Sequence, residues 1–472
     1  MKKTKIVATM GPSTSNKEVL KEMIKTGLNV CRINFSHGSY EDHEKSIRNI
    51  REISDELGIS VAILADLQGP KIRTHEMQDN GMMLEDGKEV KITTEKMLGT
   101  AKVFSINYTL LPVEAKPGER ILLDDGKLVL EVVSSDKKSE LICKVVQGGM
   151  LSSKKGVNLP NTKISLPSLT EKDKLDLEFA LDQNVDWVGL SFVRSARDII
   201  ELKHIIKSRN HHAKVIAKIE KPEALDNIDD IIQETDGIMV ARGDLGVEIP
   251  YQNVPLIQKM LIQKGIRFAK PVIVATQMME SMITNLTPTR AEVNDVANAV
   301  LDGTDAVMLS GETSVGKYPV EVIKTMVNII EEMEGFEGIY NKEELPEKTK
   351  ERFISDSICF NACRLSQRVQ AKAILTMSFS GYTAYKIASQ RPNTQIYVFT
   401  SNKRILAQLN LVWGVRGFYY NKRISTDHTI ADIKYILKSN KYIETGDLVI
   451  NIASIPLEDL GSSNMLKLSY VD

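Results

Sequence analysis

The segment Lys214-Val215-Ile216-Ala217-Lys218-Ile219-Glu220 is a short apolar run that ends in charge. A second run of this kind, Gly237-Ile238-Met239-Val240-Ala241, is followed by Arg242-Gly243-Asp244. Short apolar runs like these predict strands that are buried on both faces, as in a parallel sheet. A charge at the end of a buried strand is costly unless it is paired or binds a ligand. The two segments therefore indicate where the polar chemistry of the chain lies.

The charged residues at these strand ends favour a metal and phosphate site. Lys218 and Glu220 are two residues apart, so both side chains point to the same face of an extended strand. Two carboxylates, Glu220 and Asp244, that converge from neighbouring strands suit Mg²⁺. A lysine beside them would meet the negative charge of a phosphoryl group. A structural salt bridge is the alternative, and neither segment alone decides between the two.

Apolar runs of similar length recur along the chain, and helical segments separate them. A capping box at Ser15 and Glu18 predicts one helix start, and another at Thr289 and Glu292 predicts a second. The predicted strands are Lys5–Thr9, Val30–Phe35, Val61–Ala65, Trp187–Phe192, Lys214–Ile219, Gly237–Ala241, Pro271–Ala275 and Ala306–Leu309. Eight strand–helix units spanning about 245 residues fit a (β/α)8 TIM barrel of ~250 residues, with a doubly wound sheet as the alternative.

Polar residues follow most of these predicted strands. In a (β/α)8 barrel, ligands bind at the carboxyl ends of the strands, so these residues are expected to share one face. They are Arg32, Asn34, Ser36, Asp66, Lys218, Glu220, Asp244, Thr276 and Glu312.

Two further domains are predicted around the barrel, which takes residues 1–69 and 167–340. Between 70 and 166 the apolar period changes to 2, which predicts an inserted β lid domain. It includes a hairpin with an Asp-Gly turn at 124–127 and a loop at 153–160. Residues 353–472, beyond a Lys/Glu-rich linker, alternate helix and strand signals and predict a C-terminal α/β domain.

Composition restricts the location and the partners of the protein. The chain has 472 residues with a net charge of −1, which gives no reason to expect binding to nucleic acid or a charged membrane. Its first apolar run is too short for a signal peptide, and no stretch reaches the ~20 apolar residues of a membrane span. Four scattered cysteines form no disulfide framework, and Cys359 and Cys363 are expected to be buried thiols. We expect a cytoplasmic protein.

Long motifs then connect these residues to a known family. They are Ala8-Thr9-Met10-Gly11-Pro12, Arg32-Ile33-Asn34-Phe35-Ser36-His37-Gly38, Gly156-Val157-Asn158-Leu159-Pro160, Ala217-Lys218-Ile219-Glu220, Met239-Val240-Ala241-Arg242-Gly243-Asp244-Leu245-Gly246, Ala275-Thr276-Gln277-Met278 and Leu309-Ser310-Gly311-Glu312-Thr313. With them the sequence resembles the pyruvate kinases over nearly the whole chain. The resemblance implies transfer of the phosphoryl group of phosphoenolpyruvate to ADP, giving pyruvate and ATP. It also implies a regulatory role for the C-terminal domain and a homotetramer.

The resemblance carries residue roles onto matching positions. It makes Glu220 and Asp244 the ligands of the catalytic Mg²⁺ (or Mn²⁺), and Lys218 the group that stabilises the phosphoryl group in flight and the developing enolate. Arg32 holds the substrate phosphate. The substrate carboxylate lies by Gly243, Asp244 and Thr276. The nucleotide phosphates are contacted by Arg73, Lys155 and the loop residues Asn34, Phe35, Ser36 and His37.

Structural roles are the alternatives for several of these residues. Arg32 could cover the barrel rim, Lys155 could be a solvated loop charge, and Thr276 could cap the helix that follows it. His37 could be structural. Two rival functions remain as well: a lyase or mutase that acts on phosphoenolpyruvate or pyruvate with Mg²⁺, or a metabolite sensor without turnover.

A monovalent cation site is also implied, at Asn34, Ser36, Asp66 and the Leu67 carbonyl. The sequence departs from the K⁺-requiring members of the family at 66–73. Those members carry Thr-Lys where this chain has Leu67-Gln68, and Glu where it has Lys71. Because a lysine ammonium beside the phosphate site can supply the charge that K⁺ brings, we expect activity without K⁺.

The expected effector site is a loop of small residues in the C-terminal domain. Ser378, Ser380, Gly381 and Thr383 match a phosphate-binding loop of relatives that are activated by sugar bisphosphates. Phe379 stands where one such relative has a lysine, and the segment Pro456–Gly461 is acidic. We therefore expect weak activation, or none, by fructose 1,6-bisphosphate.

Overall fold

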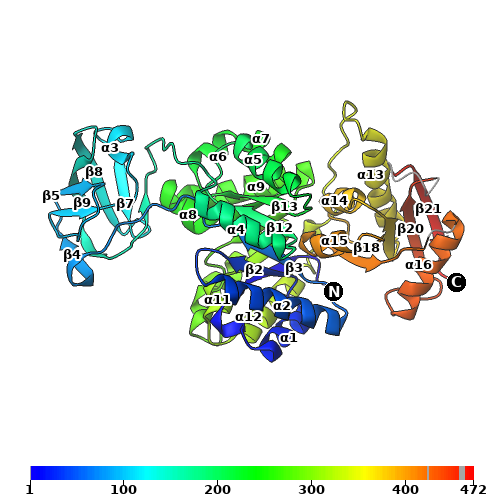
Figure 1. Cartoon of the computed structure of the whole chain (residues 1–472). Coiled ribbons are helices and arrows are strands. Elements are labelled where there is room, and N and C mark those ends of the chain that lie inside the picture. Colours follow the sequence, from blue (N-terminus) through cyan, green and yellow to red (C-terminus); the bar gives the residue numbers. More distant parts are fainter. Residues whose placement is uncertain (1, 423–424, 456–462) are drawn as a thin grey trace.

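The central body of the protein is a closed barrel of eight parallel strands (Figure 1). The structure is a computed structural model that describes residues 2–422, 425–455 and 463–472. The barrel strands follow the order β1-β16-β15-β14-β13-β12-β3-β2, so the first and last strands pair and close the sheet. They are β1 (Lys5–Thr9), β2 (Val30–Asn34), β3 (Ala62–Asp66), β12 (Trp187–Leu190), β13 (Lys214–Ile219), β14 (Gly237–Ala241), β15 (Val272–Ala275) and β16 (Ala306–Leu309). The predicted (β/α)8 barrel is confirmed.

Helices surround this barrel and bury its outer face. They are α1 (Lys17–Thr26), α2 (Tyr40–Leu57), α4 (Glu171–Asp182), α5 (Ala196–Ser208), α6 (Pro222–Asp226), α7 (Ile228–Glu234), α8 (Arg242–Glu248), α9 (Val254–Phe268), α10 (Arg290–Leu301), α11 (Gly311–Ser314) and α12 (Pro319–Met333). The main apolar core lies between these helices and the strands, and a smaller cluster around Trp187, Ile216 and Met239 fills the barrel interior. The interior is thus packed with side chains, as this fold requires.

Local capping explains where two of these helices begin. The Thr289 side chain accepts from the Glu292 N–H and caps α10, as predicted. At α1 the prediction is wrong by one position. Asn16 is the cap, because its side chain accepts from the Glu18 N–H, whereas the Ser15 hydroxyl donates to the Pro12 carbonyl of the preceding turn.

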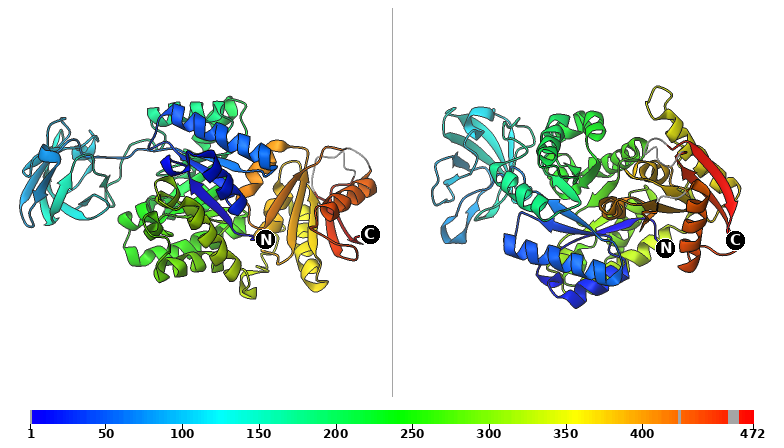
Figure 2. Two further views of the ribbon diagram at one scale, coloured as in Figure 1. Left: turned by 90° about the horizontal axis from the view of Figure 1, so that it is seen from below. Right: turned by 45° about the vertical axis from the view of Figure 1, so that its right-hand side comes forward.

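The lid is a separate β body joined to the barrel by two chain segments (Figures 1 and 2). Its elements are β4 (Gly81–Leu84), β5 (Glu89–Thr93), β6 (Val103–Ser105), α3 (Leu111–Glu114), β7 (Arg120–Leu123), β8 (Leu128–Ser135), β9 (Glu140–Gln147), β10 (Gly149–Ser152) and β11 (Val157–Asn158). The expected hairpin is β7–β8, with Asp124, Asp125 and Gly126 in left-handed conformations.

Two expected boundaries in and beside the lid are wrong. The segment 153–160 is not all loop, because Val157 is buried in the lid core and β11 pairs with β7. The strand expected to reach Phe192 ends at Leu190. The backbone of Phe192 is left-handed, with φ 54°, which extended strand geometry excludes.

The C-terminal domain packs against the amino end of the barrel, opposite the lid (Figure 1). Its elements are α13 (Phe353–Arg368), β17 (Ala373–Met377), α14 (Tyr382–Ser389), β18 (Gln395–Thr400), α15 (Lys403–Gln408), β19 (Val415–Tyr419), α16 (Thr426–Ser439), β20 (Leu448–Ala453) and β21 (Met465–Tyr470). The sheet order is β19-β18-β17-β20-β21, and β21 is antiparallel to β20.

Other expectations concern cysteines, membrane spans and the effector segment. Cys31, Cys143, Cys359 and Cys363 are free and buried, as expected for the last two. In the part of the chain that the structure describes, no helix combines the length and apolar character needed to span a bilayer. The acidic segment Pro456–Gly461 lies outside the described residues.

Candidate active site

Lys218 lies at the centre of the polar cluster at the carboxyl end of the barrel. Its Nζ is 3.1 Å from Asp66 Oδ1 and 3.0 Å from Glu220 Oε1, and it donates to Ser191 Oγ at 2.7 Å. Lys218 lies near the end of β13 and Glu220 directly follows that strand. Asp66 ends β3, and Ser191 follows β12. The closed sheet therefore brings together charges that are distant in the sequence.

Arg32 joins the same cluster from β2. Its Nε is 2.7 Å from Asp66 Oδ2, and its Nη1 donates to Thr9 Oγ1 at 2.9 Å. The two Asp66 oxygens are thus held by two different cations. A side chain at Gly189 would place a Cβ 3.2 Å from Asp66 Oδ1, so glycine at this position leaves room for the buried carboxylate.

Burial and pairing set the charge states of the cluster. Burial would raise the pKa of Asp66, but Lys218 and Arg32 hold it below its usual range. Burial would lower the pKa of Lys218, but Asp66 and Glu220 raise it overall, so the ammonium persists at neutral pH. The pKa of Glu220 is raised by burial and by the nearby charge of Asp244. Asp66, Glu220 and Asp244 together carry more negative charge than Lys218 and Arg32 neutralise.

Thr276 and the first turn of α8 form the next part of the site. The Thr276 hydroxyl accepts from the Gly243 N–H at 2.8 Å and donates to the Ala275 carbonyl at 2.6 Å. It therefore caps α8, not the helix that follows it in sequence. Its backbone has φ 69°, which costs a β-branched residue about 1–3 kcal/mol and is typical of functional sites.

The backbone of Phe192 is a part of the site that the sequence did not reveal. Its N–H donates to Glu220 Oε2 at 2.8 Å, while Lys218 occupies Oε1. Both oxygens of Glu220 are therefore oriented in a side chain that is only 1% exposed. An apolar residue gives no sequence signal for such a backbone contact.

The predicted nucleotide-binding residues lie on two sides of the site. Arg73 Nη1 donates to the Lys154 carbonyl at 3.1 Å, and the Lys155 N–H donates to Thr74 Oγ1, so the structure brings Arg73 and Lys155 together. Lys155 Nζ is also 2.9 Å from Asp124 Oδ1 within the lid.

On the barrel side, the Asn34 side chain accepts from the Ser36 N–H. Burial lowers the pKa of His37, and the charges of Arg73, Lys71 and Arg32 lower it further.

Three predicted residues are less available than the sequence suggested. The Phe35 ring packs in the barrel core, 4.7 Å between ring centroids from His43, so only its backbone is left to face a nucleotide. The Leu67 carbonyl accepts from the Ser191 hydroxyl at 2.7 Å. Glu312 is buried and accepts from the Met279 and Ser310 N–H groups, which makes it a structural anchor.

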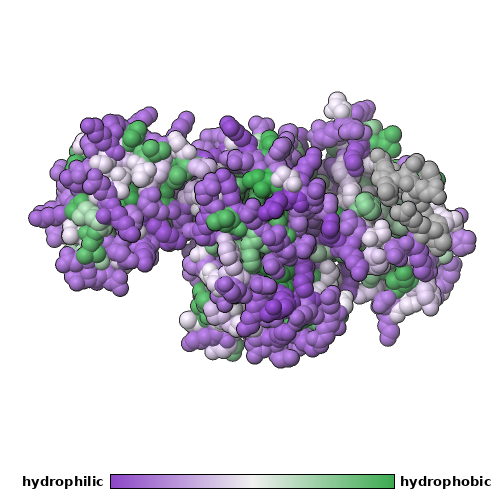
Figure 3. Space-filling model, viewed as in Figure 1, coloured by the Kyte–Doolittle hydropathy of each residue, from purple (hydrophilic) through white to green (hydrophobic). Residues whose placement is uncertain are grey.

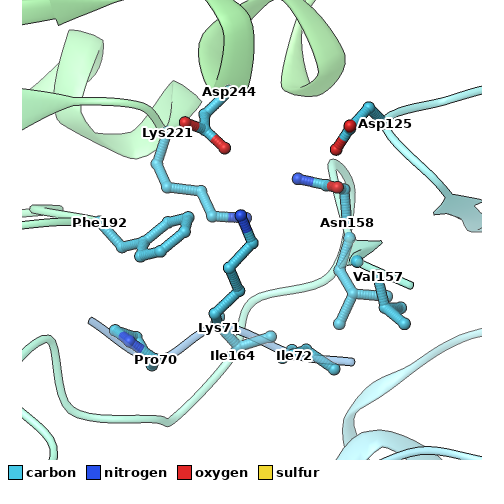
Figure 4. A pocket seen from close by; sticks show the side chains of 12 residues that line it. Pro70, Lys71, Ile72, Asp125, Val157, Asn158, Ile164, Phe192, Lys221 and Asp244 are labelled. Atoms are coloured by element: carbon cyan, nitrogen blue, oxygen red, sulfur yellow. The ribbon is translucent and has the colours of Figure 1, made fainter. Parts of the chain in front are cut away.

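A pocket opens between the connecting segment Pro70–Ile72, the lid and the barrel (Figure 4). The Asp244 and Asp125 carboxylates lie on one side of it, and the Lys71 and Lys221 side chains extend into it. Lys71 therefore points into the pocket and not out to solvent. Asp244 is the metal-ligand candidate that faces this space.

The donor set fits Mg²⁺ held partly by substrate. Among the described residues, no group of three or more His, Cys, Asp or Glu side chains could by itself hold a metal. Glu220 and Asp244 supply two hard oxygen ligands, and burial followed by the charge of Asp244 raises the pKa of Glu220. Mg²⁺ is commonly bound in this way, by one or two carboxylates plus phosphate oxygens and water.

A (β/α)8 barrel with charged residues at its carboxyl end and an inserted lid defines a barrel enzyme with its active site under that lid. Comparison with known proteins identifies the family to which this enzyme belongs. Residues 1–323 match the family model described as pyruvate kinase, barrel domain, and residues 356–469 match pyruvate kinase, alpha/beta domain. The chain belongs to the pyruvate kinase family.

Individual relatives support this assignment over the full length of the chain. Pyruvate kinase of Staphylococcus haemolyticus is 43% identical over 475 residues, covering 100% of this chain and 81% of the relative. Pyruvate kinase of Geobacillus stearothermophilus is 43% identical over 478 residues, covering 100% and 80%. The crystal structure of a pyruvate kinase from Cryptosporidium parvum superposes with a TM-score of 0.93 at 36% identity, covering 100% of this chain and 96% of that chain. The protein is an enzyme, a phosphotransferase of the pyruvate kinase type, and the family uses a divalent metal, usually Mg²⁺.

Proposed function

We propose that the cluster around Lys218 is the phosphoryl-transfer site, at which phosphoenolpyruvate and ADP are converted to pyruvate and ATP. The observation that carries this proposal is the position of Lys218, whose ammonium is held by Asp66, Glu220 and Ser191 at the barrel's carboxyl end. In phosphoryl transfer the protein contributes mainly positioning and electrostatic stabilisation, and little covalent chemistry. A fixed, permanently charged lysine supplies both.

In this proposal, different residues bind the phosphate end and the carboxylate end of phosphoenolpyruvate. Arg32, oriented by Asp66 and Thr9, binds the phosphate. Lys218 stabilises the phosphoryl group in flight and the negative charge of the developing enolate. The Gly243 backbone, Asp244 and the Thr276 hydroxyl receive the carboxylate end. Catalysis requires Lys218 to bind the transition state more tightly than the substrate.

Glu220 and Asp244 would hold the Mg²⁺ ion (or Mn²⁺), which when bound neutralises phosphoryl oxygens and orients them. Support comes from their convergence at neighbouring strand ends and from the charge of Asp244, which together with burial raises the pKa of Glu220. On the nucleotide side, we assign Arg73, Lys155 and the loop Asn34 to His37, with Phe35 contributing only backbone. The adjacency of Arg73 and Lys155 supports this assignment.

The proposal also includes independence from K⁺. Lys71 extends into the pocket beside Asp244, and its charge is felt at His37 (Figure 4). In this proposal its ammonium supplies the charge that a monovalent cation would bring at Asn34, Ser36, Asp66 and the Leu67 carbonyl. In addition, that carbonyl already accepts a hydrogen bond. The positive charge of Lys71 would then replace the mobile ion.

Initial rates of ADP-dependent pyruvate formation test this directly. We expect substantial turnover with Mg²⁺ in Na⁺ or tetramethylammonium buffer without K⁺, and none without ADP. The variant Lys71→Glu should lose most of that turnover and recover it when K⁺ is added. The matched control is Lys102→Glu, at an exposed lid position, which makes the same charge change and should behave as wild type. A wild-type enzyme that is silent without K⁺ would refute the replacement by Lys71.

We also propose how the chain is divided and assembled. The domains are 1–69 with 167–340, 70–166 and 353–472, and three separate apolar cores support this division. The face in Figure 3 is mainly hydrophilic with small apolar patches. Exposed apolar side chains include Tyr251 and Leu256 near α9 and Leu468 and Tyr470 on edge strand β21, which suits subunit contacts in a homotetramer. Family membership supports a cytoplasmic location, with no nucleic acid or membrane as partner.

A further inference from the structure

The side chain of Asn158 in the lid reaches across to the barrel at the edge of the pocket. Asn158, in β11, donates its Nδ2–H to Glu248 Oε1 at 2.9 Å. Glu248 is the last residue of α8 and belongs to the barrel. The same Oε1 is 2.6 Å from Lys221 Nζ. One carboxylate oxygen is therefore held from the lid and from the barrel at once.

The barrel residues of this contact are buried, so its loss would be energetically costly. The Glu248 side chain is 1% exposed and that of Lys221 is 8% exposed. Within the described part of the chain, Glu248 Oε2 is buried without a hydrogen-bond partner. Because a buried carboxylate with unfilled hydrogen-bonding capacity is costly, the loss of the Asn158 donor would leave Glu248 still less satisfied. A second close approach, 3.7 Å between an added Cβ at Gly126 and the Val247 side chain, shows that the lid also meets α8 one residue earlier.

The barrel partners connect directly to the metal carboxylates. Asp244 and Glu248 are four residues apart on α8, so they lie on one face of the helix. Lys221 directly follows Glu220. On the lid side, Asn158 is three residues from Lys155, which the proposed function places on the nucleotide phosphates. The contact thus joins the nucleotide side of the site to its metal side.

We propose that Asn158, Glu248 and Lys221 form a lid latch that holds the lid over the barrel and so sets the affinity for ADP. Asn158 is a positioning residue, since it acts through Lys155 and not on the reacting atoms. The latch rests on the proposed function for its effect on ADP, but its effect on the lid position does not. Phosphoenolpyruvate, bound by barrel residues alone, should be much less affected.

Fluorescence energy transfer between the lid and the barrel measures the latch without turnover. The four native cysteines are buried, so labels can be placed on Lys138→Cys in the lid and Asp230→Cys on α7, both exposed. In the ligand-free enzyme, Asn158→Ala should lower the transfer efficiency, which reports a more open lid. The control is Asn161→Ala, at an exposed lid asparagine, which should leave it unchanged. Equal efficiencies in Asn158→Ala and wild type would overturn the latch.

An exchange of groups tests the hydrogen bond itself. Asn158→Asp sets two carboxylates against each other and should open the lid further than Asn158→Ala does. Adding Glu248→Gln to that variant restores one donor and one acceptor, and the new carboxylate remains near Lys221. The double variant should therefore close the lid again. If it stayed as open as Asn158→Asp alone, the lid would be held by other contacts and the proposal would be wrong.

Kinetics separate the latch from the nucleotide assignment. Asn158→Ala should raise KM for ADP about tenfold, as expected for loss of one hydrogen bond to a charged group, with KM for phosphoenolpyruvate nearly constant. Lys155→Met should also raise KM for ADP. If only Lys155→Met did so, the latch would fail. If Lys155→Met had no effect, the nucleotide role of Lys155 would fail, and the fluorescence measurement would still judge the latch.

Discussion

The barrel carries buried ion pairs at both of its ends, and only one end has the features of an active site. At the carboxyl end, Lys218 and Arg32 pair with Asp66. At the amino end, Arg391 Nη2 is 2.8 Å from Asp305 Oδ2 and also donates to the Gly303 carbonyl. Both clusters are buried, both use Arg and Asp, and both lie near residues with left-handed backbone, Thr276 and Arg391. Burial, pairing and strain therefore do not separate a site from a structural joint.

Access to a pocket and charge balance do separate them. Lys218 and Arg32 keep 12% and 11% of their side chains exposed at the lid-facing end, whereas Arg391 and Asp305 keep 2% and 4% beneath the C-terminal domain. At the carboxyl end Asp244 faces an open pocket, which leaves room for a metal. At the amino end Asp305 also accepts from the Trp413 N–H, so the pair is enclosed and joins two domains.

The largest expected effect is that of Glu220→Gln at the carboxyl end. The change keeps the side-chain volume but weakens a metal ligand, so turnover should fall about a thousandfold. Steady-state kinetics with excess Mg²⁺ and thermal unfolding measure the two consequences. The melting temperature should change little, because the Phe192 N–H keeps an acceptor. A variant with near wild-type turnover would remove Glu220 from the metal site.

Lys218→Met should come next. Lys218 is assigned mainly to charge in the transition state. We therefore expect kcat to fall roughly several hundredfold, while KM for phosphoenolpyruvate changes by a much smaller factor. Asp66 and Glu220 would lose a cation, so rates should be compared well below the melting temperature. Retention of kcat with a large rise in KM would assign Lys218 to ground-state binding instead.

Arg391→Met probes the other end and should change stability instead of chemistry. It leaves Asp305 buried without its charged partner, which typically costs about 3–5 kcal/mol. Denaturant unfolding measures this cost, and kcat at a temperature where the variant is folded should stay within about twofold of wild type. A large loss of kcat in a stable Arg391→Met enzyme would show that the amino end also participates in function.

The smallest expected effect is that of fructose 1,6-bisphosphate. In the predicted effector loop, the Ser378 hydroxyl accepts from the Gly381 N–H and the Thr383 hydroxyl is hydrogen-bonded to Ser463. Phe379 projects there with 49% exposure and brings no charge to a phosphate. Titration with the bisphosphate at subsaturating phosphoenolpyruvate should change the rate little, whereas strong activation at micromolar concentration would contradict this expectation.

The sequence predicted the barrel because its strands are continuous apolar runs, a local signal. It also indicated Lys218, Glu220 and Asp244 as candidate site residues, since costly charges at strand ends stand out. It missed Phe192 because a contact made by a backbone N–H does not depend on residue type. The left-handed backbone of Phe192 also explains why β12 ends before the predicted strand end. The helix cap at Asn16 was misplaced by one residue among several polar candidates.

Contacts between residues that are far apart in the sequence could not be predicted from local sequence patterns. Asn158 and Glu248 are 90 residues apart, and nothing in either neighbourhood indicates their hydrogen bond. The same holds for Arg391 and Asp305, which are 86 residues apart and belong to different domains. Phe35 was expected to contact the nucleotide because it belongs to the loop Asn34–His37, which was assigned to the nucleotide as a whole. Its ring instead packs in the core. Which side of a loop faces a site is decided by packing, and packing requires the fold.

Binding of Mn²⁺, followed by electron paramagnetic resonance, tests the central claim most directly. It compares wild type, Glu220→Gln and Arg391→Met without turnover. If the carboxyl end is the metal and phosphoryl site, Glu220→Gln should weaken Mn²⁺ binding at least about tenfold, while Arg391→Met should bind as wild type does. Equal Mn²⁺ affinity in wild type and Glu220→Gln would contradict the account.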